Sequence, residues 1–180
     1  METEELRRAQ LGDERAITQL VATYQQSVFK VCYRMLGETT EAEDATQEAL
    51  VKAVLNLQSY DVDRAFKPWL LRIASNECID RLRRRKYPLS LDGLGDDGAW
   101  EWKSGDGPSP EYEVVRRERR AEIRSLLDAL GPVDRTLVTL FYWEGMSYAE
   151  IEAVTDLTVS AIKSRLFRAR RTMAELLVKE

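Results

Sequence analysis

The sequence predicts an all-α protein made of two small helical domains joined by a flexible acidic linker, with a helix-turn-helix in the second domain. Apolar residues recur at spacings of three and four through both halves of the 180-residue chain, and no alternating strand pattern competes with them. Between the halves, residues 88–113 hold five of the nine glycines and three of the five prolines. This composition is typical of a tether, so we expect domains at 1–87 and 116–180 and a linker at 88–115.

Two helices are expected at the start of the first domain. One begins at Asp13 and continues until Gly37, because glycine readily adopts the left-handed backbone that ends a helix. The next is expected to begin at Thr40, which forms a capping-box pattern with Glu43, and to bury an alanine-rich stripe that reaches Leu57.

A third helix is expected over residues 65–86. Proline is tolerated only in the first turn of a helix, so Pro68 places the helix start close to it. The segment combines aromatic residues, an asparagine and a basic run at 81–86 (RLRRRK). Aromatic rings can stack on unpaired bases, and arginines can follow phosphates. Phe66 and Trp69 are nevertheless more often core residues than stacking platforms.

The second domain contains four predicted helices, at about 111–129, 133–143, 147–154 and 159–177. A short connection joins the last two, and this arrangement is typical of a helix-turn-helix. Thr158 is expected to cap the final helix through its hydroxyl. Asp156 occupies the turn, where glycine is common, and aspartate tolerates a left-handed backbone better than most residues.

Charge is strongly segregated along the chain, although the formal net charge is only −4. Residues 81–86 and residues 158–172 each carry five basic side chains and no acidic one. Residues 1–80 and 87–115 carry the compensating acidic excess. The net charge therefore does not exclude a nucleic-acid partner.

Several classes of enzyme are excluded by composition. The chain has no histidine, so it has no Ser-His or Cys-His relay and no imidazole metal ligand. Cys32 and Cys78 are too few for a cysteine-rich zinc site and are expected to be buried thiols. Glu41, Asp44 and Glu48 share a helix face, but a carboxylate-bridged metal site in a helical bundle normally needs histidine partners. We expect no catalytic residue, metal, cofactor or small-molecule substrate.

The N-terminal residues METEELRRAQ are polar and charged, which does not fit a signal peptide. No apolar stretch approaches the roughly 18 residues that a membrane span needs. The sequence therefore predicts a cytoplasmic protein.

The final predicted helix has the features of a DNA-recognition helix. Its inward positions are apolar from Val159 to Met173, and short residues near its start permit close approach to a groove. A solvated basic helix at the end of an ordinary bundle is the simpler interpretation, but the helix-turn-helix spacing and the absence of acids favour DNA binding. The outward-facing candidates for DNA contact are Ser160, Lys163, Ser164, Arg165, Phe167, Arg168 and Arg171.

Three segments together resemble the extracytoplasmic-function (ECF) sigma factors, the compact group of sigma-70-type bacterial initiation factors. TEAEDATQEALVKA (40–53) is similar to the polymerase-binding helix of that family. FKPWLLRIASNECIDRLRRRK (66–86) is similar to the helix that opens and reads the −10 element, and residues 130–173 are similar to the domain that reads the −35 element. With its flanking helices, the resemblance covers about residues 13–86 and 116–177.

The resemblance implies a role for each matched position. Asp44, Gln47 and Glu48 would dock on a coiled coil of the polymerase β′ subunit, although the residues alone indicate only a solvated helix face. The loop before the third helix would capture a flipped promoter base together with Asn76. The outward face of the final helix would read the −35 element. The residues implied at the −10 element are Tyr60, Phe66, Asn76, Arg81, Arg84 and Arg85.

The resemblance also implies core RNA polymerase (β′ and β subunits) and promoter DNA as partners, with control by an anti-sigma factor. Two alternatives stay open: a polymerase-independent helix-turn-helix regulator, and a scaffold or inhibitor-binding protein whose basic segments are incidental. No glycine-rich phosphate loop or nucleophile motif supports an enzyme. The acids of the linker are expected to mask the basic segments, and Trp100 and Trp102 within it receive no role.

Overall fold

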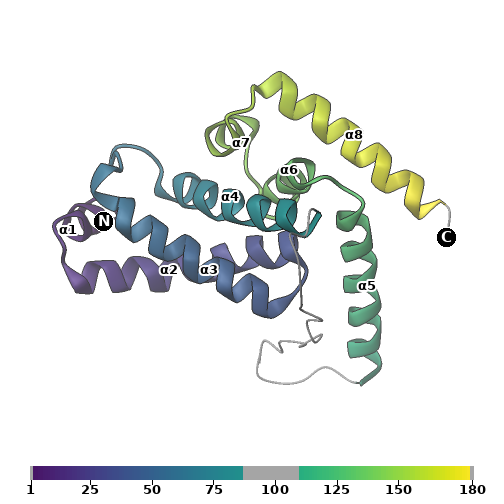
Figure 1. The fold of residues 1–180 in the computed structure, drawn as a ribbon, viewed down its shortest axis with the longest axis horizontal. Helices are drawn as coiled ribbons and strands as arrows, with labels where there is room; N and C mark the ends of the chain where they lie inside the picture. The colour runs from purple at the N-terminus through teal and green to yellow at the C-terminus, as the bar shows by residue number, and fades with distance from the viewer. Residues whose placement is uncertain (1, 87–109, 179–180) are drawn as a thin grey trace.

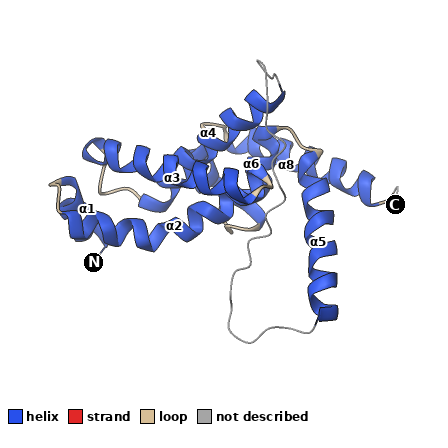
Figure 2. Ribbon diagram, turned by 60° about the horizontal axis from the view of Figure 1, so that its bottom comes forward, coloured by secondary structure: helices blue, strands red, loops and turns tan. Residues whose placement is uncertain are grey.

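The computed structural model describes residues 2–86 and 110–178, and every regular element within these ranges is a helix (Figures 1 and 2). The predicted all-α fold is confirmed. The predictions for Trp100, Trp102 and the linker acids lie outside the described residues. The helices are α1 (Glu2–Gln10), α2 (Glu14–Leu36), α3 (Thr39–Asn56), the 3-10 turn η1 (Leu57–Ser59), α4 (Phe66–Lys86), α5 (Pro110–Asp128), α6 (Pro132–Tyr142), α7 (Tyr148–Thr155) and α8 (Val159–Leu177).

Helix α1 was not predicted from the sequence. Its residues Leu6 and Ala9 are buried, and the side-chain amide of Gln10 donates to the backbone carbonyls of Leu57 and Tyr60 at 2.9 and 2.7 Å. Two buried residues in a charged segment give little periodicity. Contacts with a distant part of the chain, rather than the local pattern, therefore stabilise this short helix.

The ends of α2 and the start of α4 follow the prediction. The carboxylate of Asp13 accepts hydrogen bonds from the first turn of α2, and Gly37 ends the helix with a left-handed φ of 76°. Helix α4 begins at Phe66, which leaves Pro68 in its first turn. The N–H groups of the first turn have no partner within the helix, so a proline there, which lacks an N–H, removes no helical hydrogen bond.

The predicted cap of α3 is wrong. The helix begins at Thr39, and its N-cap is Glu38 rather than Thr40 with Glu43. The two carboxylate oxygens of Glu38 accept hydrogen bonds from the N–H groups of Thr40 and Glu41 at 2.8 and 2.6 Å. The carboxylate of Glu38, folded over the first turn of the helix, thus supplies both acceptors, and no threonine hydroxyl is needed.

The C-terminal helices match the expected positions, with one difference. Helix α5 begins at Pro110, so residues 110–115, expected in the linker, are helical. The turn between α7 and α8 contains Asp156 at φ 56°, as its tolerance of left-handed backbone predicts. None of the described helices is long and apolar enough to cross a membrane.

Two helical units, α1–α4 (the N-terminal unit) and α5–α8 (the C-terminal unit), pack against each other. Helix α6 contacts α2 and α4 of the N-terminal unit as well as α7 and α8, and α7 lies beside α4 (Figure 1). Buried residues such as Leu71, Leu137 and Ile162 belong to one continuous core. Cys32 and Cys78 are buried free thiols within it, as predicted. The sequence predicted two domains joined by a flexible linker, and it did not indicate this contact between them.

Candidate nucleic-acid interface

Helix α8 is held at its N-terminus by two side chains. The hydroxyl of Thr158 accepts a hydrogen bond from the N–H of Ala161 at 3.3 Å, as predicted, and a carboxylate oxygen of Glu152 accepts one from the N–H of Val159 at 3.0 Å. These bonds satisfy donors that the helix cannot pair internally. Its inward side is anchored by a stripe of fully buried residues, namely Ile162, Leu166 and Ala169.

The opposite side of α8 is exposed to solvent. The side chain of Phe167 is 62% exposed, which is unusual for so large an apolar group. With the exception of Arg165, all the DNA-contact candidates on this helix are exposed and lie on this side. They are Ser160, Lys163, Ser164, Phe167, Arg168 and Arg171.

Arg165 differs from the other candidates because it is only partly exposed and is held by a carboxylate. Its Nη1 donates to Oδ1 of Asp134 in α6 at 2.7 Å. The sequence analysis missed Asp134, whose negative charge lies outside the basic segment and gives no local signal. Two weaker contacts orient neighbouring cations: Lys163 Nζ lies 5.2 Å from the ring centroid of Tyr148, and Arg171 Nε donates to Glu175 at 2.9 Å.

The aromatic residues at the start of α4 form a core cluster instead of an open stacking platform. Tyr60 and Phe66 are only 6% and 5% exposed, with ring centroids 5.4 Å apart. Trp69 lies 4.7 Å from Tyr60, and Tyr24 of α2 lies 5.2 Å from Phe66. These rings are therefore covered by protein in this structure, and the exposed surface of Tyr60 and Phe66 is small.

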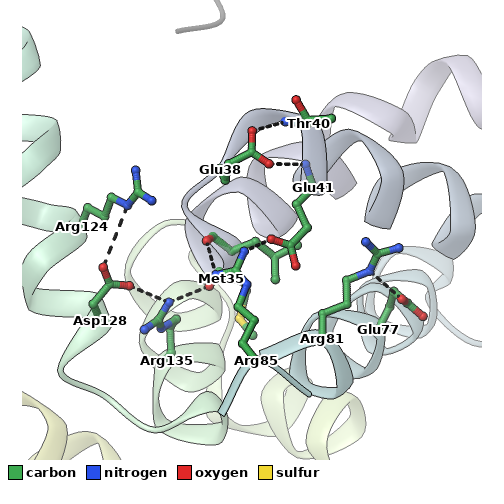
Figure 3. Close-up of polar contacts among 11 residues, drawn as sticks. Met35, Glu38, Thr40, Glu41, Glu77, Arg81, Arg85, Arg124, Asp128 and Arg135 are labelled. Carbon is green, nitrogen blue, oxygen red and sulfur yellow. Dashed lines mark hydrogen bonds and ion pairs between the residues drawn. The ribbon is translucent and has the colours of Figure 1, made fainter. Parts of the chain in front are cut away.

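The basic run of α4 is divided between exposed and bound side chains, as Figure 3 shows for Arg81 and Arg85. Arg81 is 16% exposed and pairs with Glu77 at 2.8 Å and with Glu48 at 3.2 Å. Arg85 donates to the carbonyl of Leu36 at 3.0 Å and pairs with the α3 residue Glu41. Both arginines therefore join α4 to neighbouring helices, while Asn76 and Arg84 remain exposed.

Glu77 is the central acid of this network. Burial alone would raise its pKa, but hydrogen bonds from Lys52 and Arg81 outweigh that effect and lower the pKa of Glu77 to about 2. The carboxylate is 5% exposed and is ionised at neutral pH. It therefore fixes Arg81 as a structural cation between α3 and α4.

The face of α3 matched to polymerase binding is open. Asp44, Gln47 and Glu48 are all exposed, at the i, i+3 and i+4 spacing that places side chains on one side of a helix. Val51 and Leu55 are 57% and 76% exposed on the following turns. The sequence analysis did not single out these two apolar residues, although they continue the same spacing.

Two of the three carboxylates considered for a metal site are engaged in ion pairs, and the third, Asp44, is exposed. Glu41 pairs with Arg85, and Glu48 pairs with Arg81. Within residues 2–86 and 110–178, no group of three or more histidine, cysteine, aspartate or glutamate side chains is placed to hold a metal ion.

Comparison with known proteins gives the family. Residues 20–87 match the family model for sigma-70 region 2, and residues 120–173 match that for sigma-70 region 4. The chain is 35% identical to the ECF RNA polymerase sigma factor SigW of Bacillus subtilis, over 96% of this chain and 94% of the relative. It is 34% identical to the ECF RNA polymerase sigma-E factor of Escherichia coli, over 92% and 88%.

A solved structure agrees with these relatives. The structure of CnrH in complex with the cytosolic domain of CnrY superposes with a TM-score of 0.72 and 28% identity, covering 99% of this chain and 98% of CnrH. Sequence and fold therefore point to the same group over nearly the whole length. The chain belongs to the ECF sigma factors of the sigma-70 family, which are initiation factors of transcription.

Proposed function

We propose that this sigma factor binds core RNA polymerase through α3, reads the −35 element with α8 and holds the opened −10 element with α4. The observation that carries the proposal is the outer side of α8, which is exposed, basic and without an acid between residues 158 and 172. An uncovered basic helix after a capped turn is the geometry that enters a major groove.

At the −35 element, Arg168 is proposed as the main base reader. Lys163 and Arg171 would contact phosphates, and Phe167 would contact a thymine methyl group. The small side chains of Ser160 and Ser164 would allow the helix to approach the bases closely. Arg165 is proposed to contact DNA while its guanidinium group stays paired with the carboxylate of Asp134.

At the −10 element, we propose fewer DNA-contacting residues than the sequence resemblance implied. Asn76 would bond the edge of an unpaired base, and Arg84 would follow the backbone. Arg81 and Arg85 would support α4 through their glutamate partners. No bond chemistry is involved, because binding unpaired bases more tightly than paired ones shifts the population toward open DNA.

The proposed polymerase contact is the exposed acid-amide face of α3, directed at the β′ subunit, with the β subunit as a further partner. We propose that residues 1–87 carry the polymerase and −10 functions and that the −35 function resides in the helices from α5 onward. With these roles the protein would act in the cytoplasm, under the control of an anti-sigma factor. The solved structure of the relative CnrH, captured with the cytosolic domain of CnrY, supports that control.

The test is transcription in vitro with purified core polymerase and genomic promoter fragments. Wild-type protein should co-purify with core polymerase and produce defined start sites. The Asp44→Ala/Gln47→Ala variant should lose co-purification, whereas the control Gln25→Ala/Asp80→Ala, which alters one exposed amide and one exposed acid elsewhere, should keep it. Tight, sequence-specific binding of the free protein to duplex DNA, with no dependence on polymerase, would instead establish a polymerase-independent regulator.

A further inference from the structure

A polar pocket lies between α2, the start of α4 and the turn that joins α6 to α7. Its volume is about 330 Å³, within the range of about 300–1,000 Å³ that small-molecule sites occupy. Three cations line it, namely Lys30 and Arg34 of α2 and Lys67 of α4. The turn contributes Trp143 and the one carboxylate of the pocket, Glu144. None of these residues belongs to the faces proposed for DNA or polymerase.

Arg34 differs from the other arginines that the fold partly covers. Among the residues whose side chains the structure describes, five arginines are half-buried or buried. Four of them pair with a carboxylate: Arg72 with Asp156, Arg81 with Glu77, Arg135 with Asp128 and Arg165 with Asp134. The fifth, Arg34, forms no ion pair with any described carboxylate. It is therefore a half-buried cation without a paired anion.

The contacts that Arg34 does make are weak substitutes for an anion. Its Cζ lies 5.2 Å from the centroid of the Trp143 ring, and its Nη1 donates to the carbonyl of Lys30 over a long 3.4 Å. Burial lowers the pKa of the Arg34 guanidinium, and the attraction of Glu144 offsets that effect only in part. The charged guanidinium is thus less well stabilised here than in water.

The other charges of the pocket add to this imbalance. Lys30 precedes Arg34 by four residues on α2, and like charges at this spacing repel each other. Lys67 Nζ lies 2.9 Å from Glu144, whose carboxylate also accepts a hydrogen bond from the hydroxyl of Ser27 at 3.2 Å. The carboxylate is therefore already engaged, and the two cations of α2 have none of their own. Three cations against one carboxylate leave an excess of two positive charges.

We propose that this pocket binds a small phosphate-bearing anion. A phosphate ester carries about −1.5 to −2 charges at neutral pH, which matches the excess of two cations, whereas a carboxylate supplies only one charge. The planar guanidinium of Arg34 binds two phosphate oxygens, and the ammonium of Lys30 acts as a point charge. Lys67, which Glu144 holds in place, faces the anion from α4.

Two sources of this chemistry fit the pocket, namely free pyrophosphate and the phosphate chain of a nucleotide. The cations serve both sources in the same way. Trp143 distinguishes them, because its ring is 36% exposed and an exposed aromatic ring is a surface on which a base stacks. A nucleotide therefore gains a contact at Trp143 that pyrophosphate lacks.

The position of the pocket gives binding a consequence for the whole chain. Its walls come from both helical units, so an anion that binds it stabilises the folded arrangement by mass action. The sigma factor would in this way respond to a phosphate-bearing metabolite. The inference goes beyond the proposed function and does not rest on it, since no contact with polymerase or promoter enters the argument.

The test is isothermal titration calorimetry of the full-length protein in a phosphate-free buffer at constant ionic strength. Inorganic phosphate, pyrophosphate and ATP are titrated separately, and pyrophosphate should bind saturably at one site per chain. Arg34→Gln should weaken this binding about tenfold or more, as the loss of charge-assisted hydrogen bonds does. The control Arg15→Gln removes an exposed arginine of the same helix and should bind pyrophosphate as wild type does.

A second variant guards against a loss of structure. Lys30 is exposed, so Lys30→Gln should keep wild-type helicity by circular dichroism and should also weaken pyrophosphate binding. Equal affinities for pyrophosphate and ATP would identify the free polyphosphate as the ligand. Tighter binding of ATP, reduced to the pyrophosphate level by Trp143→Ala, would identify a nucleotide.

Two results would overturn the inference. One is the absence of saturable binding by phosphate, pyrophosphate and ATP alike. The other is an affinity for pyrophosphate that is the same in wild type, Arg34→Gln and Lys30→Gln. Since neither measurement uses polymerase or promoter DNA, failure here is distinct from failure of the proposed function.

Discussion

Helices α4 and α8 both carry concentrated basic charge, but they use it differently. On α8, Lys163, Arg168 and Arg171 are exposed on a side that the rest of the protein leaves uncovered. On α4, Arg81 and Arg85 are bound by glutamates of α3 and α4. The comparison teaches that an exposed basic side chain without a carboxylate partner from a neighbouring helix indicates DNA binding more strongly than a basic run in the sequence does. The same contrast holds for the aromatic residues of the two helices.

The largest expected difference lies between Phe66 of α4 and Phe167 of α8. Phe66 is buried in an aromatic cluster, so Phe66→Ala should lower the free energy of unfolding by about 3–5 kcal/mol. Phe167 is exposed, so Phe167→Ala should change it by less than about 0.5 kcal/mol while weakening promoter binding. Chemical denaturation of both variants measures the contrast. Equal stability losses would show that the two aromatic residues are not in different environments.

The next largest expected effect concerns Glu77, the acid that binds Arg81 of α4. The pKa of Glu77 falls from 4.5 to about 2, so the stabilisation by its ionised form is complete above the unfolded pKa and is lost as pH falls toward 2. The loss amounts to about 2–3 kcal/mol over that window. Unfolding measured between pH 6 and pH 2 should show this acid dependence in wild type and a flatter curve for Glu77→Gln. The same slope in both proteins would refute the role of Glu77.

A third prediction separates two arginines of α8. Arg168→Ala should weaken −35 binding by about 1–3 kcal/mol at unchanged stability, as loss of a base contact would. Arg165→Ala should weaken binding and also cost up to about 1 kcal/mol of stability, because it breaks the pair with Asp134. Binding of the polymerase complex to promoter DNA and thermal unfolding provide the two readouts. Unchanged binding in both variants would count against α8 as the reading helix.

The smallest expected effect distinguishes Arg84 from its neighbour Arg85 in the basic run of α4. Arg84 is exposed, so Arg84→Ala should reduce the slope of log affinity against log salt by about 0.7–0.9, as loss of one phosphate contact does. Arg85 is bound to Glu41 and to the Leu36 carbonyl, so Arg85→Ala should leave the slope unchanged and lower stability slightly. A salt titration of polymerase-dependent DNA binding distinguishes them. The reverse pattern would restore Arg85 as the phosphate contact.

Local signals in the sequence predicted much of the fold. Asp13, Gly37, Pro68 and Thr158 mark helix ends through their own side chains or backbone preferences, and each lies where the sequence placed it. Glu38 escaped prediction because glutamate is an uncommon N-cap. Helix α1 escaped because its stability depends on contacts made about 50 residues away.

The sequence predicted those parts of the candidate DNA and polymerase sites that lie on one face of a single helix. The exposed side of α8 followed from its spacing. The pairing of Arg165 with Asp134, of Arg81 with Glu77 and Glu48, and of Arg72 with Asp156 depends on how helices pack. Of these residues, only Asp156 was noted in the sequence as unusual, because it stands where glycine is common, but the sequence did not predict its pairing with Arg72.

The most direct test of the account is the base preference of transcription by the reconstituted polymerase complex, read by sequencing transcripts from a library of randomised promoters. Wild type should select defined bases at both the −35 and −10 elements. Arg168→Ala should lose selectivity at one or two −35 positions and keep its −10 preference, while Arg120→Ala, which removes an exposed arginine of α5, should behave as wild type. An unchanged −35 preference in Arg168→Ala would contradict the claim that the exposed face of α8 reads the promoter.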